Sequence, residues 1–351
     1  MCGRKNCMFS MKISKVELEA TPPSIFVGRF GYPKVFAGPM FSPSDNPEFY
    51  DSPEKWTGNI EDVVKLRMKV ARGMKPVDVK APANPDKYIL ELQEAVSSIK
   101  PLELETKISK LDLKPKFDTI VKPAGMSIKI DDFKLETNPK IPDKVEKLYY
   151  DDLKAEESVY YLFKHGFSDY YIQKIMSAGM LGELKNRKLV PTRWSVTAVH
   201  EIIARKLKRE ILDYKEINDV LMYHFEHFGN KFFVVFYPSN LSFELVEIWG
   251  NWVGRDREYI KNKKRYSNLS GGYYAARLPV FQYLSKLKRK AGILVVREVT
   301  PSYTVPLGVW VVEEGIKRAL REKPIKFDSF SEAVSHIKNI KFSRQLTLSD
   351  F

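Results

Sequence analysis

The segment from Arg255 to Arg265 combines the two kinds of side chain that nucleic-acid binding requires. Lysine and arginine neutralise phosphates, and the tyrosines that follow this segment can stack on unpaired bases. The alternative is a solvated loop whose tyrosines, including Tyr273 and Tyr274, belong to the core, and the sequence leaves both open. The residues predicted to contact nucleic acid are Arg255, Arg257, Lys261, Lys263, Lys264, Arg265 and Tyr266.

Three arginines in motifs rich in glycine or aromatic residues define a second hypothesis. Arg29, Arg193 and Arg277 could converge on one pocket and bind phosphate, as in an enzyme acting on damaged nucleic acid or a nucleotide. Gly271-Gly272 before a helix could present free amides to that phosphate, although a tight turn is their commoner role. Their spacing fits neither a dinucleotide nor a P-loop fingerprint, and no serine lies in a nucleophile elbow. We therefore identify no recognisable catalytic motif.

Metal binding is only partly supported by the sequence. His224 and His227 could share an ion if this segment were helical, but their spacing is not that of the zincin motif. Cys2 and Cys7 could supply half of a tetrahedral zinc site, which needs four ligands, and the chain has no other cysteine. A zinc cofactor is therefore possible, but its ligand set is incomplete.

The end of the chain has the spacing of a docking peptide. Leu348 and Phe351 would point the same way from a 3₁₀ turn, while the Gln345 amide could hydrogen-bond at the rim of a pocket. This pattern matches the peptide by which replication and repair proteins bind the DNA polymerase sliding clamp (PCNA). The alternative is a helical end that packs on its own domain. The motif also departs from the usual pattern, because no second aromatic residue follows Phe351.

Composition excludes several classes of protein. The 351 residues are 44% hydrophobic and 13% aromatic, which indicates a folded chain, and the longest apolar runs are too short to span a bilayer. Two cysteines and a polar N-terminus predict a cytoplasmic protein without disulfides or a membrane partner. Of the net charge of +14, residues 229–351 carry +10, with 21 Lys and Arg against 11 Asp and Glu. This excess suggests DNA as a partner, although heat-adapted proteins also have charged surfaces.

Hydrophobic periodicity predicts an α+β fold with a mixed or antiparallel sheet in the C-terminal part and a flexible tail. The expected helices are 60–72, 86–98, 149–165, 170–178, 196–212, 273–290, 315–321 and 330–337. The expected strands are 25–27, 35–37, 231–237, 243–249, 293–299 and, less clearly, 309–313, with half-exposed strands or a ribbon in 102–134.

Five segments in order resemble the archaeal Nre family of DNA-repair proteins over nearly the whole chain. The segments are 24–35, 51–56, 191–199, 271–277 and 305–310. The resemblance implies two Nre domains and a terminal clamp-binding peptide, which would be Gln345, Leu348 and Phe351. It also implies a four-cysteine zinc element, of which Cys2 and Cys7 resemble the second half.

This resemblance implies a role in repair but no reaction. We accordingly expect an N-terminal segment at 1–12, domains at 13–228 and 229–341, and a tail at 342–351. The leading hypothesis is a repair protein that binds the clamp and contacts DNA. The alternatives are the enzyme described above and a scaffold that binds no nucleic acid.

Overall fold

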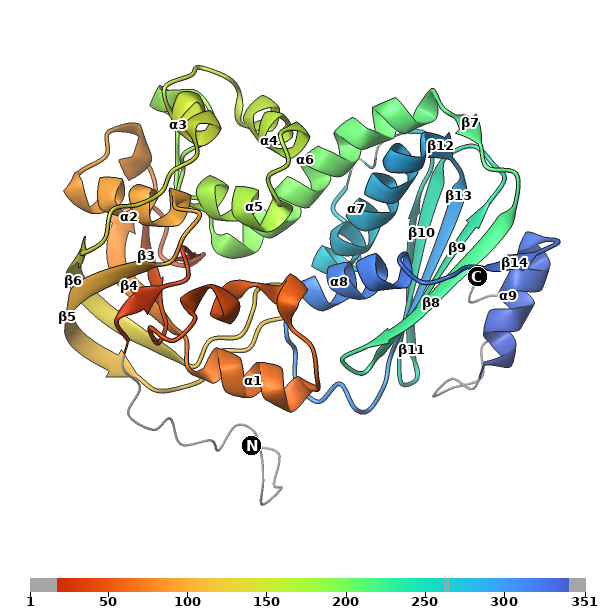
Figure 1. Cartoon of the computed structure of the whole chain (residues 1–351), viewed down its shortest axis with the longest axis horizontal. Helices are drawn as coiled ribbons and strands as arrows, with labels where there is room; N and C mark the ends of the chain where they lie inside the picture. The colour runs from red at the N-terminus through yellow and green to blue at the C-terminus, as the bar shows by residue number, and fades with distance from the viewer. Residues whose placement is uncertain (1–17, 262, 264, 341–351) are drawn as a thin grey trace. The chain divides into compact units, whose positions relative to one another are not determined.

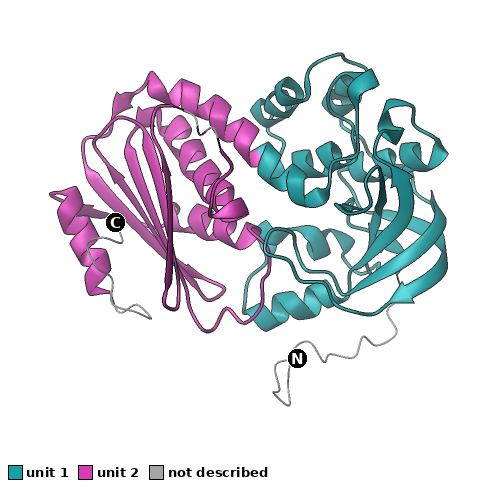
Figure 2. Ribbon diagram, turned by 180° about the vertical axis from the view of Figure 1, so that it is seen from behind, with its two compact units in different colours: residues 1–199 teal, residues 200–351 magenta. Residues whose placement is uncertain are grey.

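The computed structural model describes residues 18–261, 263 and 265–340, and these divide into two compact units, residues 1–199 and residues 200–351 (Figure 2). The division falls within a helix. The predicted boundary at 228/229 lies instead between two paired strands, β8 (Val220–His227) and β9 (Asn230–Tyr237). The two units are described separately below.

The first unit contains a six-stranded sheet with strand order β1-β5-β6-β4-β3-β2 (Figure 1). Only the β4–β6 pair is parallel. The strands are β1 (Ala20–Thr21), β2 (Ile25–Val27), β3 (Lys34–Phe41), β4 (Ala71–Asp78), β5 (Leu102–Asp112) and β6 (Met126–Leu135).

Helices α2 (Lys87–Ser97) and α5 (Asp169–Ser177) pack on this sheet, and each buries an apolar face. Helix α2 begins at an Asp86 cap and buries Leu92, and its Tyr88 hydroxyl donates to the Ala37 carbonyl of β3 at 2.9 Å. Helix α5 packs against α2 and β2. The helices are α1 (Ile60–Met68), α2 (Lys87–Ser97), α3 (Asp143–Tyr149), α4 (Ala155–Lys164), α5 (Asp169–Ser177) and α6 (Thr192–Leu212), the last of which continues into the second unit.

The second unit has a mixed sheet with strand order β11-β10-β13-β9-β8-β14, in which only β10 and β13 are parallel. Helices α7 and α8 cover one face and α9 the other (Figure 1). The remaining strands are β7 (Lys215–Glu216), β10 (Ser242–Trp249), β11 (Trp252–Glu258), β12 (Arg289–Lys290), β13 (Gly292–Val299) and β14 (Ile325–Phe327), and the helices are α7 (Ser270–Leu287), α8 (Trp310–Ala319) and α9 (Phe330–Asn339).

Burial on both faces explains why the central strands are continuous apolar runs. Every residue of β13 is buried, and α8 approaches β9 so closely that a Cβ at Gly315 would lie 2.2 Å from the Phe232 ring. The described residues include no helix long and apolar enough to cross a membrane.

The predicted α+β class is confirmed, but several elements differ from their predictions. Residues 309–313 begin helix α8, and 149–165 contains the end of α3 and all of α4. The strands that were not predicted include the short β1, β7, β12 and β14 and three longer ones. The longer ones are β8, which was considered only as a possible helix, β4, which contains a proline, and β11, whose charged residues resemble a loop. Edge strands commonly carry such charges, which discourage pairing with another chain.

Candidate nucleic-acid interface

The predicted basic loop is a strand followed by a loop, and part of its charge is neutralised within the second unit. Arg255 and Arg257 lie on the edge strand β11, where Arg255 forms an ion pair with Glu244 of β10. Lys263 forms an ion pair with Asp256. Lys264 lies outside the described residues. Two of the cations predicted to contact nucleic acid, Arg255 and Lys263, therefore already have carboxylate partners.

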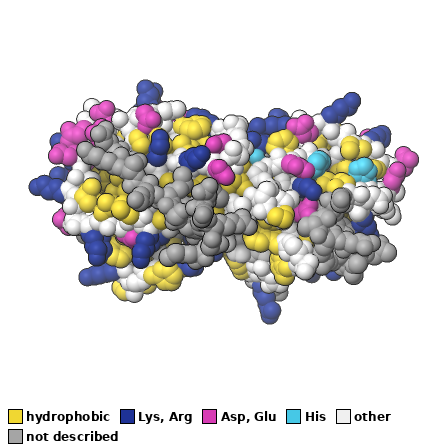
Figure 3. Space-filling view, turned by 90° about the horizontal axis from the view of Figure 1, so that it is seen from below, with side chains coloured by type: hydrophobic (Ala, Val, Ile, Leu, Met, Phe, Trp, Pro, Cys, Tyr) yellow, Lys and Arg dark blue, Asp and Glu magenta, His cyan; other side chains and the backbone are white. Residues whose placement is uncertain are grey.

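The other members of this segment remain exposed. The Arg257 guanidinium lies 5.5 Å from the centroid of the Tyr259 ring, and Lys261 and Arg265 are exposed. Tyr266 is also exposed, with its ring 5.1 Å from that of Tyr274. Figure 3 shows Lys and Arg side chains dispersed among acidic and hydrophobic ones on the face in view. The segment therefore offers exposed cations and two exposed rings, those of Tyr266 and of Tyr259, against which the Arg257 guanidinium lies.

Tyr273 and Tyr274 belong to the buried part of helix α7. These two tyrosines are therefore part of the core, which was the alternative to a role in base stacking. The Tyr273 ring lies edge-on to Phe243, with 5.2 Å between centroids. Burial raises the pKa of both phenols. Neither ring is available to stack on a base.

Arg277 does not have the environment of a phosphate ligand. Its side chain is 3% exposed and forms ion pairs with Glu258, at 2.8 Å, and with Glu201. Glu258 also lies 3.4 Å from the Lys208 ammonium. Burial opposes the charge on Arg277, but the two carboxylates raise its pKa above the ordinary value. This arginine is a structural ion-pair partner in the second unit, and its predicted role in a shared pocket loses support.

The structure brings the other two arginine motifs together in the first unit. The amide of Val27, at the end of β2, donates to the Thr192 hydroxyl at the start of α6, at 2.8 Å. Across the same junction the Tyr32 ring stacks on Trp194, with 6.2 Å between centroids and 29° between planes. Segments separated by some 165 positions are therefore neighbours.

The two arginines of this junction differ in their partners. The Arg193 guanidinium donates to both carboxylate oxygens of Asp118, at 2.6 and 2.7 Å. The backbone amide of Ile120 donates to the same carboxylate, at 2.7 Å, and fixes its position. Arg29 is exposed and lies against the Phe30 ring, at 4.7 Å. Arg193 positions the first turn of α6, whereas the guanidinium of Arg29 faces solvent.

Three exposed aromatic side chains at this junction were not predicted as functional. Phe30 is 75% exposed, Tyr32 50% and Trp194 48%, and together we name them the aromatic surface. Exposed Lys34 and Arg29 flank it. The available signal was an aromatic residue next to each arginine, in Arg29-Phe30 and Arg193-Trp194.

The histidine pair is not a helical metal motif. His224 and His227 lie on strand β8, where residues three positions apart point to opposite faces.

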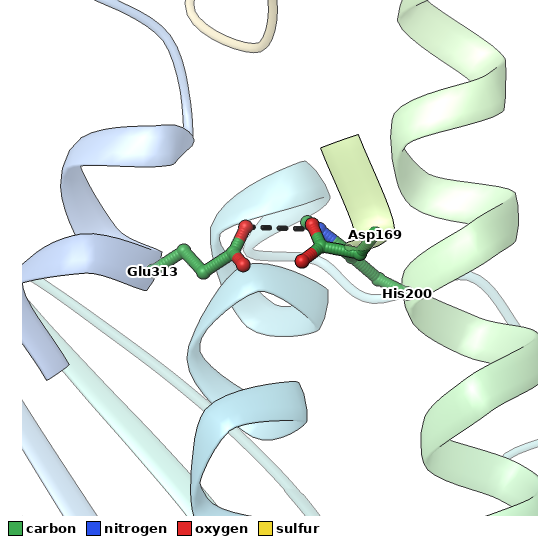
Figure 4. A group of neighbouring side chains, drawn as sticks. All are labelled: Asp169, His200 and Glu313. Atoms are coloured by element: carbon green, nitrogen blue, oxygen red, sulfur yellow. Dashed lines mark ion pairs between the residues drawn. The ribbon is translucent and has the colours of Figure 1, made fainter. Parts of the chain in front are cut away.

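Another histidine has a carboxylate partner: Nε2 of His200 lies 3.1 Å from Oε2 of Glu313 in the second unit (Figure 4). Cys2 and Cys7 lie outside the described residues, so their assignment to zinc remains a prediction.

Comparison with known proteins identifies the family. A family described as "Archaeal Nre, N-terminal" matches residues 2–252, and one described as "Archaeal Nre, C-terminal" matches residues 258–349. The chain belongs to the archaeal Nre family. The resemblance inferred from the five sequence segments is thereby confirmed.

Relatives of the chain are named as repair proteins. It is 48% identical to the DNA repair protein NreA of Archaeoglobus fulgidus, over 100% of this chain and 96% of the relative. It is 33% identical to the DNA repair protein NreB of the same organism, over 96% and 90% of the two chains. The DNA repair protein NreA of Haloferax volcanii is 32% identical, over 90% and 80%. No solved structure matches.

Proposed function

We propose that this Nre protein is a cytoplasmic DNA-repair factor that binds single-stranded DNA at the aromatic surface and docks on the sliding clamp through its C-terminal peptide. The observation that carries the DNA-binding part is the stacked Tyr32–Trp194 pair, exposed beside Phe30 and flanked by exposed cations. The names of the relatives support the repair role.

The chemistry of this surface favours unpaired bases. Exposed aromatic rings stack on any base, whereas the faces of duplex bases are covered by their neighbours in the stack. Arg29 and Lys34 supply positive charge at the same place for the sugar–phosphate backbone. Arg193 is held by Asp118, and its contribution is to fix the position of Trp194.

The basic segment of the second unit is a weaker candidate for DNA contact. It retains the exposed Arg257, Lys261, Arg265 and Tyr266, whereas the ion pairs of Arg255 and Lys263 reduce its charge. We propose that it contributes salt-sensitive phosphate contacts and little stacking. The clamp-binding part of the proposal rests on the spacing of Gln345, Leu348 and Phe351, which lie outside the described residues.

Replacing Trp194 with alanine tests the DNA-binding part. One stacked base contributes roughly 1–3 kcal/mol, so we expect the affinity for a fluorescein-labelled oligothymidine to fall at least about fivefold by fluorescence anisotropy. Tyr150→Ala is the matched control, because this tyrosine is 81% exposed in the same unit and lies outside the aromatic surface. Equal affinities for the wild type and Trp194→Ala would reject the aromatic surface as the binding site.

A further inference from the structure

One face of the first sheet is open to solvent beside the aromatic surface. Helix α2 packs on the other face, where Val35 of β3 and Ile128 of β6 are at most 1% exposed (Figure 1). Successive residues of a strand point to opposite faces, so the chain neighbours of these two side chains stand on the open side. Lys34 and Lys129 are accordingly exposed. We name the side of the sheet that carries Lys34, Phe36 and Lys129 the open face.

Phe36 of β3 presents an aromatic ring on the open face. The ring is half-buried, and the Lys129 ammonium lies over it at 5.7 Å from its centroid. Because Lys129 is itself exposed, the side of the ring that it approaches borders solvent. The amide of Gly28, next to β2, donates to the Phe36 carbonyl at 2.7 Å, and a glycine there has no side chain to cover the ring. Aromatic rings on the face of a sheet can stack on unpaired bases.

Lys129 lies directly opposite a second lysine. In the antiparallel pair of β5 and β6, its register partner is Lys110, and both side chains are exposed. Like charges opposite each other destabilise a sheet. Within the described ranges of the chain, neither lysine forms an ion pair with a carboxylate. An anion that contacts both ammonium groups, such as the phosphodiester of a DNA strand, would relieve this repulsion.

Carboxylates on the open face limit its net charge. Three of them each have a lysine as register partner or in an ion pair: Asp78 with Lys34, Glu105 with Lys134 and Asp112 with Lys116. Asp131 stands two positions beyond Lys129 on β6. Binding at this face would therefore depend on short-range contacts with a base and with phosphate, and less on long-range attraction.

We propose that the open face extends the aromatic surface into a track for single-stranded DNA, in which Phe36 stacks on one base and Lys110 and Lys129 contact the phosphates beyond it. The inference rests on the proposed function, because the same strand would also cross the aromatic surface. Tyr32 and Phe36 are four residues apart in the chain and therefore at most about 14 Å apart. From β3 to β5 the sheet crosses three strand spacings, or about 14 Å. At about 3.4 Å per nucleotide, a stacked strand would cover both distances with about eight nucleotides.

Replacing both lysines tests the phosphate contacts. Lys110→Gln/Lys129→Gln should bind a fluorescein-labelled oligothymidine of about twelve nucleotides at least about fivefold more weakly in fluorescence anisotropy, because two charge-assisted contacts are lost. The dependence of log affinity on log salt concentration should become shallower by about 1.4, since each phosphate contact to a single strand contributes about 0.7. Thermal melting should not fall, because a repulsive pair is removed. Lys144→Gln, which changes an exposed lysine of helix α3, is the control and should match the wild type. Unchanged affinity and salt dependence in the double variant would overturn the proposal.

Replacing Phe36 with leucine tests the stacking contact. Leucine keeps an apolar side chain on β3 but cannot stack on a base, so affinity for the same oligothymidine should fall at least about fivefold. Phe163→Leu is the matched control, because Phe163 is another half-buried phenylalanine of the first unit, on helix α4. Equal affinities for the wild type and Phe36→Leu would reject the stacking role of Phe36.

The length of the oligonucleotide separates this inference from the proposed function. An oligothymidine of about four nucleotides should occupy the aromatic surface alone, so Trp194→Ala should weaken its binding and the double lysine variant should not. If Trp194→Ala weakens binding of both lengths and the double lysine variant weakens neither, the proposed function stands and the track is rejected. If the variants of the open face weaken binding and Trp194→Ala does not, the open face is supported and the aromatic surface is rejected.

Discussion

At the scale of single residues, burial determines the behaviour of side chains that look alike in the sequence. His227 and His336 have the same side chain, but His227 is buried, at 6% exposure, whereas His336 is exposed. Its ring lies 4.2 Å from that of Phe228 and 6.2 Å from that of Trp310. Burial first, and the charge of Arg318 second, lower its pKa to about 3. This histidine is therefore neutral in the folded protein at physiological pH.

We expect His227 to make folding sensitive to mild acid. Its pKa is lower in the folded than in the unfolded chain, so the unfolded state binds more protons between about pH 3 and 6.5, and stability falls as the pH is lowered through that window. Through this histidine, the free energy of unfolding should be about 2 kcal/mol lower at pH 5 than at pH 7.5. The free energy of unfolding in urea should fall by about 2 kcal/mol less between pH 7.5 and pH 5 for His227→Phe than for the wild type. His336→Gln should behave like the wild type. Parallel pH profiles for His227→Phe and the wild type would contradict this expectation.

At the scale of elements, ion pairs between secondary structures hold the second unit together. Arg277 of α7 meets Glu258 at the end of β11, and Lys208 of α6 approaches the same carboxylate. Because Glu258 is 3% exposed, the loss of a partner leaves its charge poorly compensated. The arrangement allows charged side chains of α6, α7 and β11 to be buried within one unit.

Replacing Arg277 with methionine should destabilise the protein by about 3 kcal/mol, because an incompletely paired carboxylate stays buried. The double substitution Arg277→Met/Glu258→Gln should recover part of this loss, since it also removes the buried negative charge. Denaturant unfolding measures both effects, and oligothymidine affinity should stay at the wild-type value. A stable single variant with weakened oligonucleotide binding would restore Arg277 as a phosphate ligand.

At the scale of the whole molecule, clamp binding is proposed to depend on the terminal peptide and not on the folded units. A short segment that orders on docking loses conformational entropy, so we expect micromolar binding of an isolated 342–351 peptide. Phe351→Ala removes one of two apolar side chains predicted to enter the clamp, and should abolish detectable binding by calorimetry without changing thermal melting. Ser349→Ala is a matched control, because residue 349 does not share the predicted contact positions. Undiminished clamp binding by Phe351→Ala would reject the assignment.

The sequence by itself determined the family, the α+β class, most helices and the spacing of the terminal motif. These follow from local order, because periodicity and short motifs are encoded by residues a few positions apart. It misassigned β11, where edge-strand charges resemble a loop, and the start of α8 at residues 309–313.

Only the tertiary structure decided which predicted phosphate ligands are exposed. Arg193 is held by Asp118, 75 positions away in the sequence, and Arg277 is buried between two glutamates, whereas Arg29 is exposed. The aromatic surface was likewise assembled from distant segments. A charge acquires its pairing and its solvation from neighbours that folding brings together, and local spacing does not encode them.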